Sequence, residues 1–385
     1  MIYIHVPYCR SFCSYCGFYS ELVPKCGTEA FVNALCVEIT ARAEEITEEV
    51  NTLYIGGGTP SVLPLSAFAR ILEALKASGH GGPYEEFTVE VNPEDVLEKG
   101  EGYVRGLLAL GVNRISMGVQ SFDPGVLKVM NRRHDAAGAL AAVRLLRSAG
   151  VKNLGIDLIF GLGRFEGVAG GQVEFSSEVW ERTLAQALEL HPEHISAYQL
   201  SIEEGSAIEK LLERGKYSEA DDDDCAAQYS SLCKVLADAG YHHYEVSNFA
   251  LPGHEAVHNA AYWRRVPYAG FGPGAHTLLP ASLPGGDPVM RTWNNPSLKG
   301  YLKAAVSGDF ESVRERETLG PEEVRDEKIM LGLRTSEGIP ASLVGTDPAS
   351  VESMGLESLQ GDRVRIPESR LFVSDLITGE LLRQS

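Results

Sequence analysis

The sequence lacks the two features that direct a chain to or across a membrane. No apolar run approaches the roughly 20 residues that a membrane-spanning helix needs. Residues 1–20 carry three cysteines where a secretory leader has an unbroken apolar segment. We therefore expect a cytoplasmic protein.

Basic residues are scarce relative to acidic ones. The chain has 34 Lys and Arg against 53 Asp and Glu, which gives a formal net charge of −19. Nucleic-acid binding requires clustered Lys and Arg side chains that neutralise phosphates. The balance argues against a broad nucleic-acid surface, although a local basic pocket remains compatible with it.

The cysteines do not form the pattern of a disulfide framework. Such frameworks have an even number of dispersed cysteines in a short secreted chain. This chain has seven cysteines, and Cys9, Cys13 and Cys16 lie in one loop after an expected strand. Reduced thiols that serve as metal ligands fit this pattern better.

Strand-like and helix-like segments alternate through the first 200 residues. Strands that alternate with helices of this length predict an α/β fold with a parallel sheet and right-handed crossovers. Strands are expected at residues 2–6, 52–56, 87–92, 113–120, 153–160 and 194–200, and helices at about 29–47, 65–78, 95–110, 136–149 and 177–190.

Each expected strand has one apolar face and one face with polar side chains. Glu90 lies on the polar face of the third strand, and Asp157 lies on that of the fifth. A doubly wound sheet buries both faces and gives nearly continuous apolar runs, so the alternation favours an incomplete parallel (β/α)6 TIM-like barrel with a polar lumen. The functional residues of such barrels collect at the C-terminal ends of the strands, where Cys9, residues 56–59 and Gln120 also lie.

Three domains are expected along the chain. Residues 1–205 form the partial barrel, residues 206–296 a barrel-capping region and residues 297–385 a small C-terminal domain. For this last domain we expect a C-terminal α+β extension of winged-helix-like form. The later segments predict helices at about 225–239 and 322–333, a loop at 280–296, and short strands at 363–366 and 370–373.

The cysteine motif, Cys9-x3-Cys13-x2-Cys16, has the spacing of an iron–sulfur site. Three thiolates can hold three irons of a 4Fe–4S cluster, and the fourth iron is then free to bind the amino and carboxylate groups of S-adenosylmethionine (SAM). Zinc is the competing interpretation, but a structural zinc ion requires four ligands. His5 is the only obvious fourth ligand nearby, so the spacing favours the cluster.

The chain resembles the radical SAM superfamily beyond these cysteines. The Gly56-Gly-Gly-Thr-Pro60 stretch follows the second expected strand, where the superfamily carries a glycine-rich element that contacts the SAM amino group. The closer resemblance is to the group that contains anaerobic coproporphyrinogen III dehydrogenase (HemN) and the haem chaperone HemW, and it covers residues 1–280 best. Its matching stretches are residues 3–9, 54–60, 90–93, 113–122, 131–134 and 156–161.

This resemblance implies a set of cofactor-binding residues. Asp157 suits the ribose diol of SAM, and Arg132 suits the methionine carboxylate through paired hydrogen bonds. For any one polar strand residue, structural hydrogen bonding is the alternative role. The residues that would contact SAM are Tyr3, Tyr15, Gly57, Gly58, Thr59, Glu90, Gln120, Arg132 and Asp157.

Two departures separate this chain from the dehydrogenase branch of the group. Phe18 stands where the dehydrogenases carry a further cysteine, and Tyr3 almost begins the chain where they have an N-terminal extension. Both departures indicate the haem-chaperone branch. A glycine-rich insertion, Gly163 to Val173, replaces the Pro-Gly-Gln-Thr stretch that is usual in the group, and its role stays open.

The motif His258-Asn259-x-x-Tyr262-Trp263 also indicates that branch, in which it is associated with haem. His258 could be an axial ligand of the haem iron, and the two aromatic residues could cover the macrocycle. The alternative is a packed aromatic corner around a hydrogen-bonded histidine. Rival ligands are His242, His243, His254 and His276, and Arg264 or Arg265 could meet propionates.

The function that the resemblance implies is that of a haem chaperone. Such a protein binds a 4Fe–4S cluster, SAM and haem, and it passes the haem as cargo to an acceptor protein. Expected partners are haem, a haem-accepting protein and an electron donor for the cluster, with no nucleic acid and with membrane contact only through the acceptor.

Two other functions remain open from the sequence. One is an oxygen-independent coproporphyrinogen III dehydrogenase, in which radical chemistry removes carboxyl groups from the propionates oxidatively. The other is radical modification of a different substrate. Whether SAM is cleaved, and hence whether the chain is an enzyme, also stays open.

Overall fold

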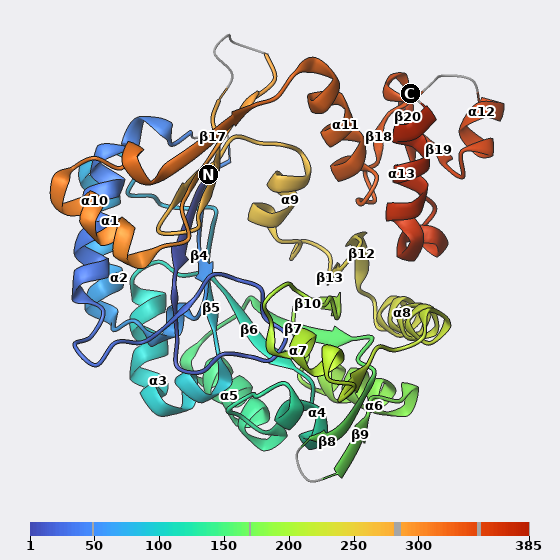
Figure 1. The fold of residues 1–385 in the computed structure, drawn as a ribbon, viewed down its shortest axis with the longest axis horizontal. Helices are drawn as coiled ribbons and strands as arrows, with labels where there is room; N and C mark the ends of the chain where they lie inside the picture. Colours follow the sequence, from blue (N-terminus) through green and yellow to red (C-terminus); the bar gives the residue numbers. More distant parts are fainter. Residues whose placement is uncertain (48–49, 169–170, 281–285, 345–347, 385) are drawn as a thin grey trace.

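The computed structural model describes residues 1–47, 50–168, 171–280, 286–344 and 348–384. A nine-stranded sheet lies at its centre, in the order β12-β13-β10-β7-β6-β5-β4-β1-β14 (Figure 1). The strands are β1 (Ile2–Val6), β4 (Thr52–Gly57), β5 (Glu86–Val91), β6 (Arg114–Gln120), β7 (Leu154–Phe160), β10 (His194–Gln199), β12 (His242–Glu245), β13 (Asn248–Ala250) and β14 (Ala269–Phe271).

Six of these strands are the ones that the sequence predicts, and they are neighbours in chain order. From β1 through β4, β5, β6 and β7 to β10, each strand pairs in parallel with the next. Strand β14 adds in parallel beside β1, and the β12–β13 hairpin adds in antiparallel orientation beside β10. Within the described residues no pairing joins β12 to β14. The α/β class with a parallel sheet is confirmed, and the sheet is open.

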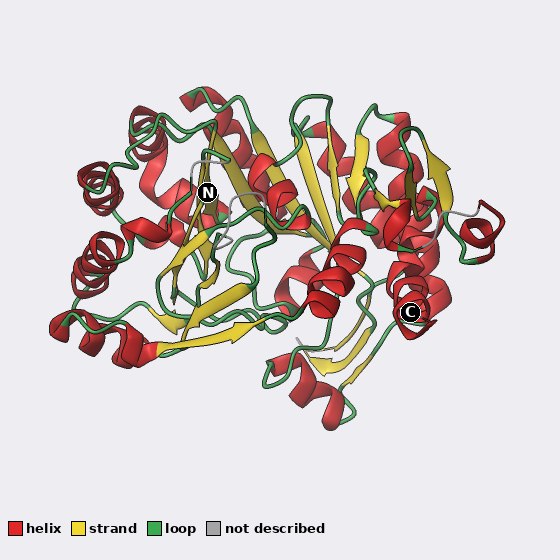
Figure 2. Ribbon diagram, turned by 90° about the horizontal axis from the view of Figure 1, so that it is seen from above, coloured by secondary structure: helices red, strands yellow, loops and turns green. Residues whose placement is uncertain are grey.

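Helices connect the parallel strands and lie outside the curved sheet, as Figure 2 shows. Helix α1 packs beside α2, and α3 packs beside α5. Helix α1 ends earlier than expected, because Arg42 leaves helical geometry with φ −119° and a single 3-10 turn follows. The helices are α1 (Glu29–Ala41), α2 (Leu65–Ala77), α3 (Pro93–Ala109), α4 (Pro124–Val129), α5 (Ala136–Ala149), α6 (Ser177–Glu189) and α8 (Asp222–Asp238).

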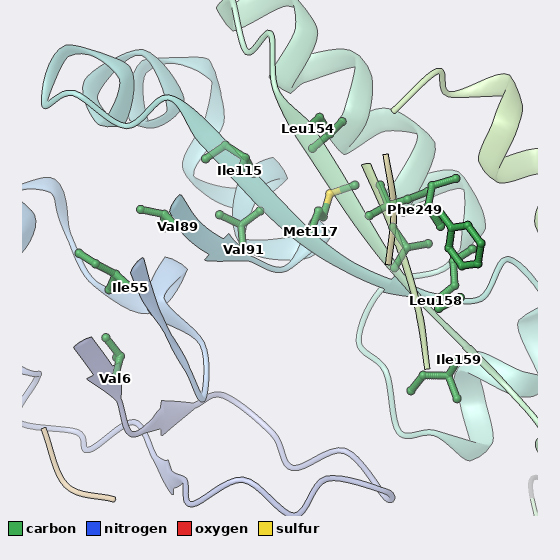
Figure 3. Close-up of a cluster of buried hydrophobic side chains, with 14 of the residues drawn as sticks. Val6, Ile55, Val89, Val91, Ile115, Met117, Leu154, Leu158, Ile159 and Phe249 are labelled. Atoms are coloured by element: carbon green, nitrogen blue, oxygen red, sulfur yellow. The ribbon is translucent and has the colours of Figure 1, made fainter. Parts of the chain in front are cut away.

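The apolar core lies on the helix-covered face of the sheet. Figure 3 shows Val6, Ile55, Val89, Ile115 and Met117, which come from four neighbouring strands. Each of these side chains is fully buried, and burying one of them stabilises the fold by roughly 1.5–3 kcal/mol. Because side chains alternate along a strand, the polar residues between them face the other side of the sheet.

A second, antiparallel sheet follows β14 and consists of β15 (His276–Leu278), β16 (Met290–Asn294) and β17 (Arg314–Thr318). The loop expected at residues 280–296 is therefore wrong for residues 290–294, because this segment pairs with a strand on each side. Residues 281–285 of that loop lie outside the described residues. Helix α10 (Leu298–Ser307) then packs against α1.

The last segment agrees with the expected C-terminal α+β extension. It contains α11 (Pro321–Gly332), α12 (Pro348–Ser353), α13 (Ser374–Gln384) and a sheet in the order β18-β20-β19. The strand expected at residues 370–373 is wrong, since Glu368–Val373 is a 3-10 helix in which Arg370 N–H donates to the Pro367 carbonyl. The three strands are β18 (Ile339–Pro340), β19 (Glu357–Leu359) and β20 (Arg363–Arg365).

Two further expectations concern segments of the chain. The insertion at residues 163–173 mostly forms the hairpin β8 (Arg164–Val168) and β9 (Gly171–Glu174), and its residues 169–170 lie outside the described residues. The domain boundaries at 205/206 and 296/297 stay predictions. In the described part of the chain, no helix is long and apolar enough to span a membrane.

Candidate functional site

A cavity of about 1040 Å³ lies at the C-terminal ends of the parallel strands. Its walls carry the polar face of the sheet, including Glu90 on β5, Ser116 and Gln120 on β6, and Asp157 on β7. The alternation in the sequence therefore correctly predicts that these side chains share one space. In parallel α/β folds this end of the sheet is where binding residues collect.

The three cysteines of the motif all line this cavity. Their loop is held against the end of α4 by hydrogen bonds: Ser14 N donates to the Met130 carbonyl at 3.1 Å and Ser14 Oγ to the Val129 carbonyl at 2.9 Å. Asn131 Nδ2 donates to the Phe12 carbonyl at 2.7 Å. Residues 129–131 thus fix the position of the cysteine loop.

Two side chains donate hydrogen bonds to the cysteine sulfurs. Thr59 Oγ1 lies 3.4 Å from Cys9 Sγ, and Arg132 Nη1 lies 3.2 Å from Cys13 Sγ. Burial raises the pKa of Cys9, and it raises the pKa of Cys16 to about 11. A bound iron ion would displace the proton from each thiol that it binds.

The competing zinc interpretation requires His5 as a fourth ligand. His5 Nδ1 is 3.0 Å from Tyr3 Oη, and His5 Nε2 is 2.9 Å from the Tyr19 carbonyl, so both ring nitrogens already have partners. Among the described residues no three His, Cys, Asp or Glu side chains converge on one metal ion. A cubane cluster needs no such convergence, because each thiolate binds a different iron.

The glycine-rich loop after β4 has no room for side chains. Gly57 has φ of +106°, and a Cβ atom there would lie 2.6 Å from the His5 ring. A Cβ on Gly58 would lie 2.8 Å from the Tyr8 carbonyl oxygen. Only glycine therefore allows the backbone at these two positions to lie so close to His5 and Tyr8, at the start of the cysteine loop.

Two half-buried carboxyl groups, those of Glu90 and Asp157, line the cavity behind this loop. Glu90 accepts hydrogen bonds from Tyr54 Oη at 2.6 Å and from Gly57 N at 3.1 Å. Burial raises the pKa of Glu90 to about 7, and the nearby Asp157 adds to the shift. Burial also raises the pKa of Asp157, which hydrogen bonds from Ser196 and Ser116 oppose. A cationic ligand in the cavity would favour the ionised form of both carboxyl groups and lower their pKa values.

Arg132 and Gln120 meet at the same side of the cavity. Arg132 Nη2 donates to Asn92 Oδ1 at 2.8 Å and to the Gly118 carbonyl at 2.7 Å. Gln120 has φ of 67°, where the β6–β7 register shifts. A strained backbone at a bulge re-aims a side chain, and here Gln120 lines the cavity.

Most of the residues that the sequence predicts to contact SAM line this cavity, but one does not. Tyr15, Gly57, Gly58, Thr59, Glu90, Gln120, Arg132 and Asp157 line it together with the cysteines. Tyr3 is not among its lining residues, and its hydroxyl group bonds His5 instead. The prediction omitted Ser196 and Tyr198 of β10, which also line the cavity. Their alternation along the sixth strand was the available signal.

All four predicted haem residues lie on helix α9 (Val257–Trp263), but their side chains have different surroundings. Asn259 lines the cysteine cavity, whereas Tyr262 lines a second pocket. His258 is fully buried, with Nδ1 2.8 Å from Thr52 Oγ1 and Nε2 3.0 Å from Tyr262 Oη. Burial lowers the pKa of His258 to about 3. Trp263 follows at the helix end and is partly exposed.

The rival histidines occupy different surroundings. His242 Nδ1 is 3.3 Å from Glu255, and His243 lies 3.2 Å from Glu368 and 3.3 Å from Tyr229 Oη. His276 stacks on Trp293 with ring centroids 5.7 Å apart. His254 lines neither the cysteine cavity nor the second pocket.

The open parallel sheet and the three-cysteine loop define the class of this chain as radical SAM. A family model described as "Radical SAM superfamily" matches residues 3–165. The structure of "Coproporphyrinogen III oxidase (HemN)" from Escherichia coli is similar with a TM-score of 0.77 and 21% identity, over 100% of this chain and 90% of that one. At this identity the likeness shows the fold.

Curated relatives show which family of this superfamily the chain resembles. "Heme chaperone HemW" of Lactococcus lactis is 35% identical over 337 residues, 88% of this chain and 82% of that protein. The Mycobacterium tuberculosis (strain H37Rv) protein of the same name is 31% identical over 99% of this chain and 94% of its own. "Radical S-adenosyl methionine domain-containing protein 1, mitochondrial" of Danio rerio is 32% identical over 96% and 82%. The chain belongs to the HemW family of radical SAM proteins.

Superfamily membership implies a 4Fe–4S cluster and SAM, and the residues present fit both groups. The cavity volume of about 1040 Å³ reaches the upper end of ligand pockets. Its walls offer three thiols and two half-buried carboxyl groups. In the described structure, the buried Nε atoms of Arg114 and Arg132 in the same walls have no hydrogen-bond partner, and an anionic ligand group would satisfy them.

Proposed function

We propose that this protein is a haem chaperone, which holds a 4Fe–4S cluster and SAM in the cysteine cavity, binds haem and passes it to an acceptor protein. The observation that carries the proposal is a shared cavity in a HemW-family chain. The three cysteines, the Gly57–Thr59 loop, Glu90 and Arg132 all line this cavity.

Cys9, Cys13 and Cys16 are the proposed cluster ligands. When bound and reduced, such a cluster supplies the electron that cleaves the sulfonium bond of SAM. The hydrogen bonds of Ser14 and Asn131 hold the loop before any metal binds. Arg132 beside Cys13 Sγ stabilises negative charge on that thiolate.

The remaining cavity residues suit the parts of SAM. Glu90 faces the ammonium group, which would lower the pKa of this carboxyl group and ionise it. Arg132 faces the methionine carboxylate, and Asp157 faces the ribose diol. The Gly57 and Gly58 backbone allows close approach to the same end of the ligand. Gln120 and Tyr15 complete the walls.

Support for haem as cargo comes from the relatives and from the motif. Several relatives carry the name "Heme chaperone HemW", and His258, Asn259, Tyr262 and Trp263 form the motif associated with that branch. We propose that this part of the chain contributes to haem binding.

The proposed partners are a haem-accepting protein and an electron donor. Phe12 lies within the cysteine loop and Phe18 lies just after it, and they are exposed by 49% and 71%. The loop is thus at the surface, where an electron donor can approach it. All seven cysteines are free thiols, which suits the reducing cytoplasm that we propose as the location.

Anaerobic reconstitution of the cluster tests the function. The full chain is supplied with haem in one arm and with coproporphyrinogen III in the other, each with SAM and a reductant. We expect a haem absorption band and haem transfer to an added apo-haem protein, without formation of protoporphyrinogen. Conversion of coproporphyrinogen III would establish the dehydrogenase alternative, and absence of haem uptake would refute the chaperone.

A further inference from the structure

A second pocket, of about 610 Å³, lies between the β15–β17 sheet and helices α9 and α11. One face of this sheet forms its floor. His276 and Leu278 alternate along β15, and they pair directly with Trp293 and Arg291 of β16. Because residues two apart on a strand point to the same face, these four side chains project together into the pocket.

Two tyrosines add aromatic lining to the pocket. The backbone of Tyr268 pairs with Leu278 beside the floor, and Tyr262, from the end of α9, meets Tyr268 edge to face, with ring centroids 4.7 Å apart. Leu331 of α11 also lines the pocket. With Leu278 and Trp293, these side chains offer apolar contacts to a ligand. Its volume lies within the range of about 300–1,000 Å³ that small-molecule sites occupy, so a flat apolar ligand fits it.

His276 brings a metal-binding group to this pocket. Its ring stacks on Trp293 with an interplanar angle of 21°, and the residue is exposed at the pocket mouth. No hydrogen bond found within the described residues involves the His276 ring. His258, in contrast, uses both ring nitrogens in buried hydrogen bonds. Of these two histidines, His276 is the one with nitrogens available to a ligand in the pocket.

Two guanidinium groups lie in the same pocket. Arg265 Nε donates to Glu327 at 2.5 Å, and Arg291 donates to Glu327 and, at 2.6 Å, to Glu317. Glu317 is exposed, so its ion pair with Arg291 is weak and replaceable. Nη1 of Arg265 is buried and has no partner in the described structure. Two cations that share one inner carboxylate favour a ligand with acidic groups.

From this arrangement we infer that the pocket is the haem site, with the His276 imidazole as the axial ligand of the iron. Tyr262 and Leu278 would contact the macrocycle, Trp293 would hold the His276 ring by stacking on it, and Arg291 and Arg265 would face the propionates. The inference rests on the proposed function, which supplies haem as the ligand. Neutral imidazole is a usual haem ligand, and the exposed mouth lets a cargo enter and leave.

His258 has a positioning role in this arrangement. Its Nε2 holds the Tyr262 hydroxyl group at 3.0 Å and its Nδ1 holds Thr52 at 2.8 Å. Loss of His258 would therefore disturb the pocket wall through Tyr262 without removing an iron ligand.

The test titrates ferric haem into full-length protein with its cluster reconstituted, and it records the visible spectrum. Wild type should show a histidine-ligated spectrum. His276→Ala should lose that spectrum and bind haem roughly tenfold or more weakly, and added imidazole should restore the spectrum. His242→Ala is the matched control, since His242 lies outside the pocket and 53% of its side chain is exposed. This control should behave as wild type.

Two further variants separate ligation from positioning. His258→Ala and Tyr262→Phe should weaken binding by similar factors and leave the band positions unchanged. Arg291→Gln should weaken binding of haem more than binding of its dimethyl ester. If wild type takes up haem and His276→Ala keeps an identical spectrum and affinity, this inference is wrong while the proposed function stands. If wild type takes up no haem, both are wrong.

Discussion

The two cavities differ in how completely the protein has arranged them. In the cysteine cavity, Glu90, Arg132 and the cysteine loop are held by several internal hydrogen bonds each. In the second pocket, Arg265 and Arg291 pair with the inner Glu327, and Arg291 also pairs with the exposed Glu317. The His276 ring stacks on Trp293, and no hydrogen bond to this ring is found among the described residues.

The difference matches the two kinds of ligand that we propose. A resident cofactor benefits from a rigid site, because groups that are already ordered lose little freedom on binding. A cargo must be released, so its site cannot depend on many buried, directional contacts. Substitutions in the cysteine cavity should therefore have large effects on cluster binding or on the free energy of unfolding. Substitutions in the second pocket should change the free energy of unfolding only slightly.

The largest effect is expected from Cys13→Ala. A cluster that has lost one of three thiolates should not persist, so iron should fall from about four atoms per chain to background. Iron and acid-labile sulfide measurements after anaerobic reconstitution check this. Cys26→Ala is the matched control, because Cys26 is an exposed thiol outside the cavity. Equal iron in both variants would contradict the proposed ligands.

Gly57→Ala should reduce stability next most strongly. The left-handed backbone and the contact with the buried His5 ring should together cost roughly 2–5 kcal/mol. Gly27→Ala is the control, because Gly27 has a similar φ of +85° but open space around it. Urea unfolding of the apo protein should show only the smaller, conformational cost of about 1 kcal/mol for Gly27→Ala.

Glu90 should make the stability of the apo protein depend on pH. Its pKa is about 7 in the folded protein because of burial, above the usual value in an unfolded chain. The folded state thus binds the proton more tightly. The resulting stability is present below the unfolded pKa and is lost as the pH rises through about 7. The loss is at most about 3 kcal/mol.

Glu90→Gln should remove this pH dependence. Urea unfolding at pH 5 and pH 8 should show a smaller decrease for the variant than for wild type. Tyr54, Asp157 and Arg114, which also act on Glu90, stay in place in both proteins. An equal decrease in the two would show that Glu90 already ionises at low pH in the folded state.

The smallest effect should come from the rim of the second pocket. Glu317 pairs with Arg291 at 2.6 Å, and both side chains are partly exposed. Its replacement by Ala should change the free energy of unfolding by less than about 1 kcal/mol. A larger loss, measured by urea unfolding, would show that this pocket is also rigidly arranged and would remove the contrast with the cysteine cavity.

Local sequence patterns were sufficient to predict the parallel sheet and most of the cysteine cavity. Period-two alternation places Glu90, Ser116 and Asp157 on one face, and parallel strands bring their C-terminal ends together. The cysteine spacing and the glycine loop identify the same end of the sheet. These signals are short in sequence, so a single chain displays them.

Long-range pairing was not predictable in the same way. Nothing local indicates that Ala269–Phe271 joins the sheet beside β1, or that Met290–Asn294 is the middle strand of a second sheet. The same limit applies to single side chains. His258 resembles a ligand-binding residue in sequence, but its partner Thr52 lies 206 positions away along the chain and becomes a neighbour only after folding.

Helix α9 contributes one lining residue to each of the two cavities. Asn259 reaches the cysteine cavity and Tyr262 reaches the second pocket, three residues or about 4.5 Å apart along the helix axis. A ligand that shifts this helix from one side moves a contact on the other side as well. If the proposed SAM and haem both bind and one changes the affinity of the other through this helix, thermodynamic reciprocity requires the reverse effect to have the same factor, so loading of the cofactor and holding of the cargo would be one coupled equilibrium.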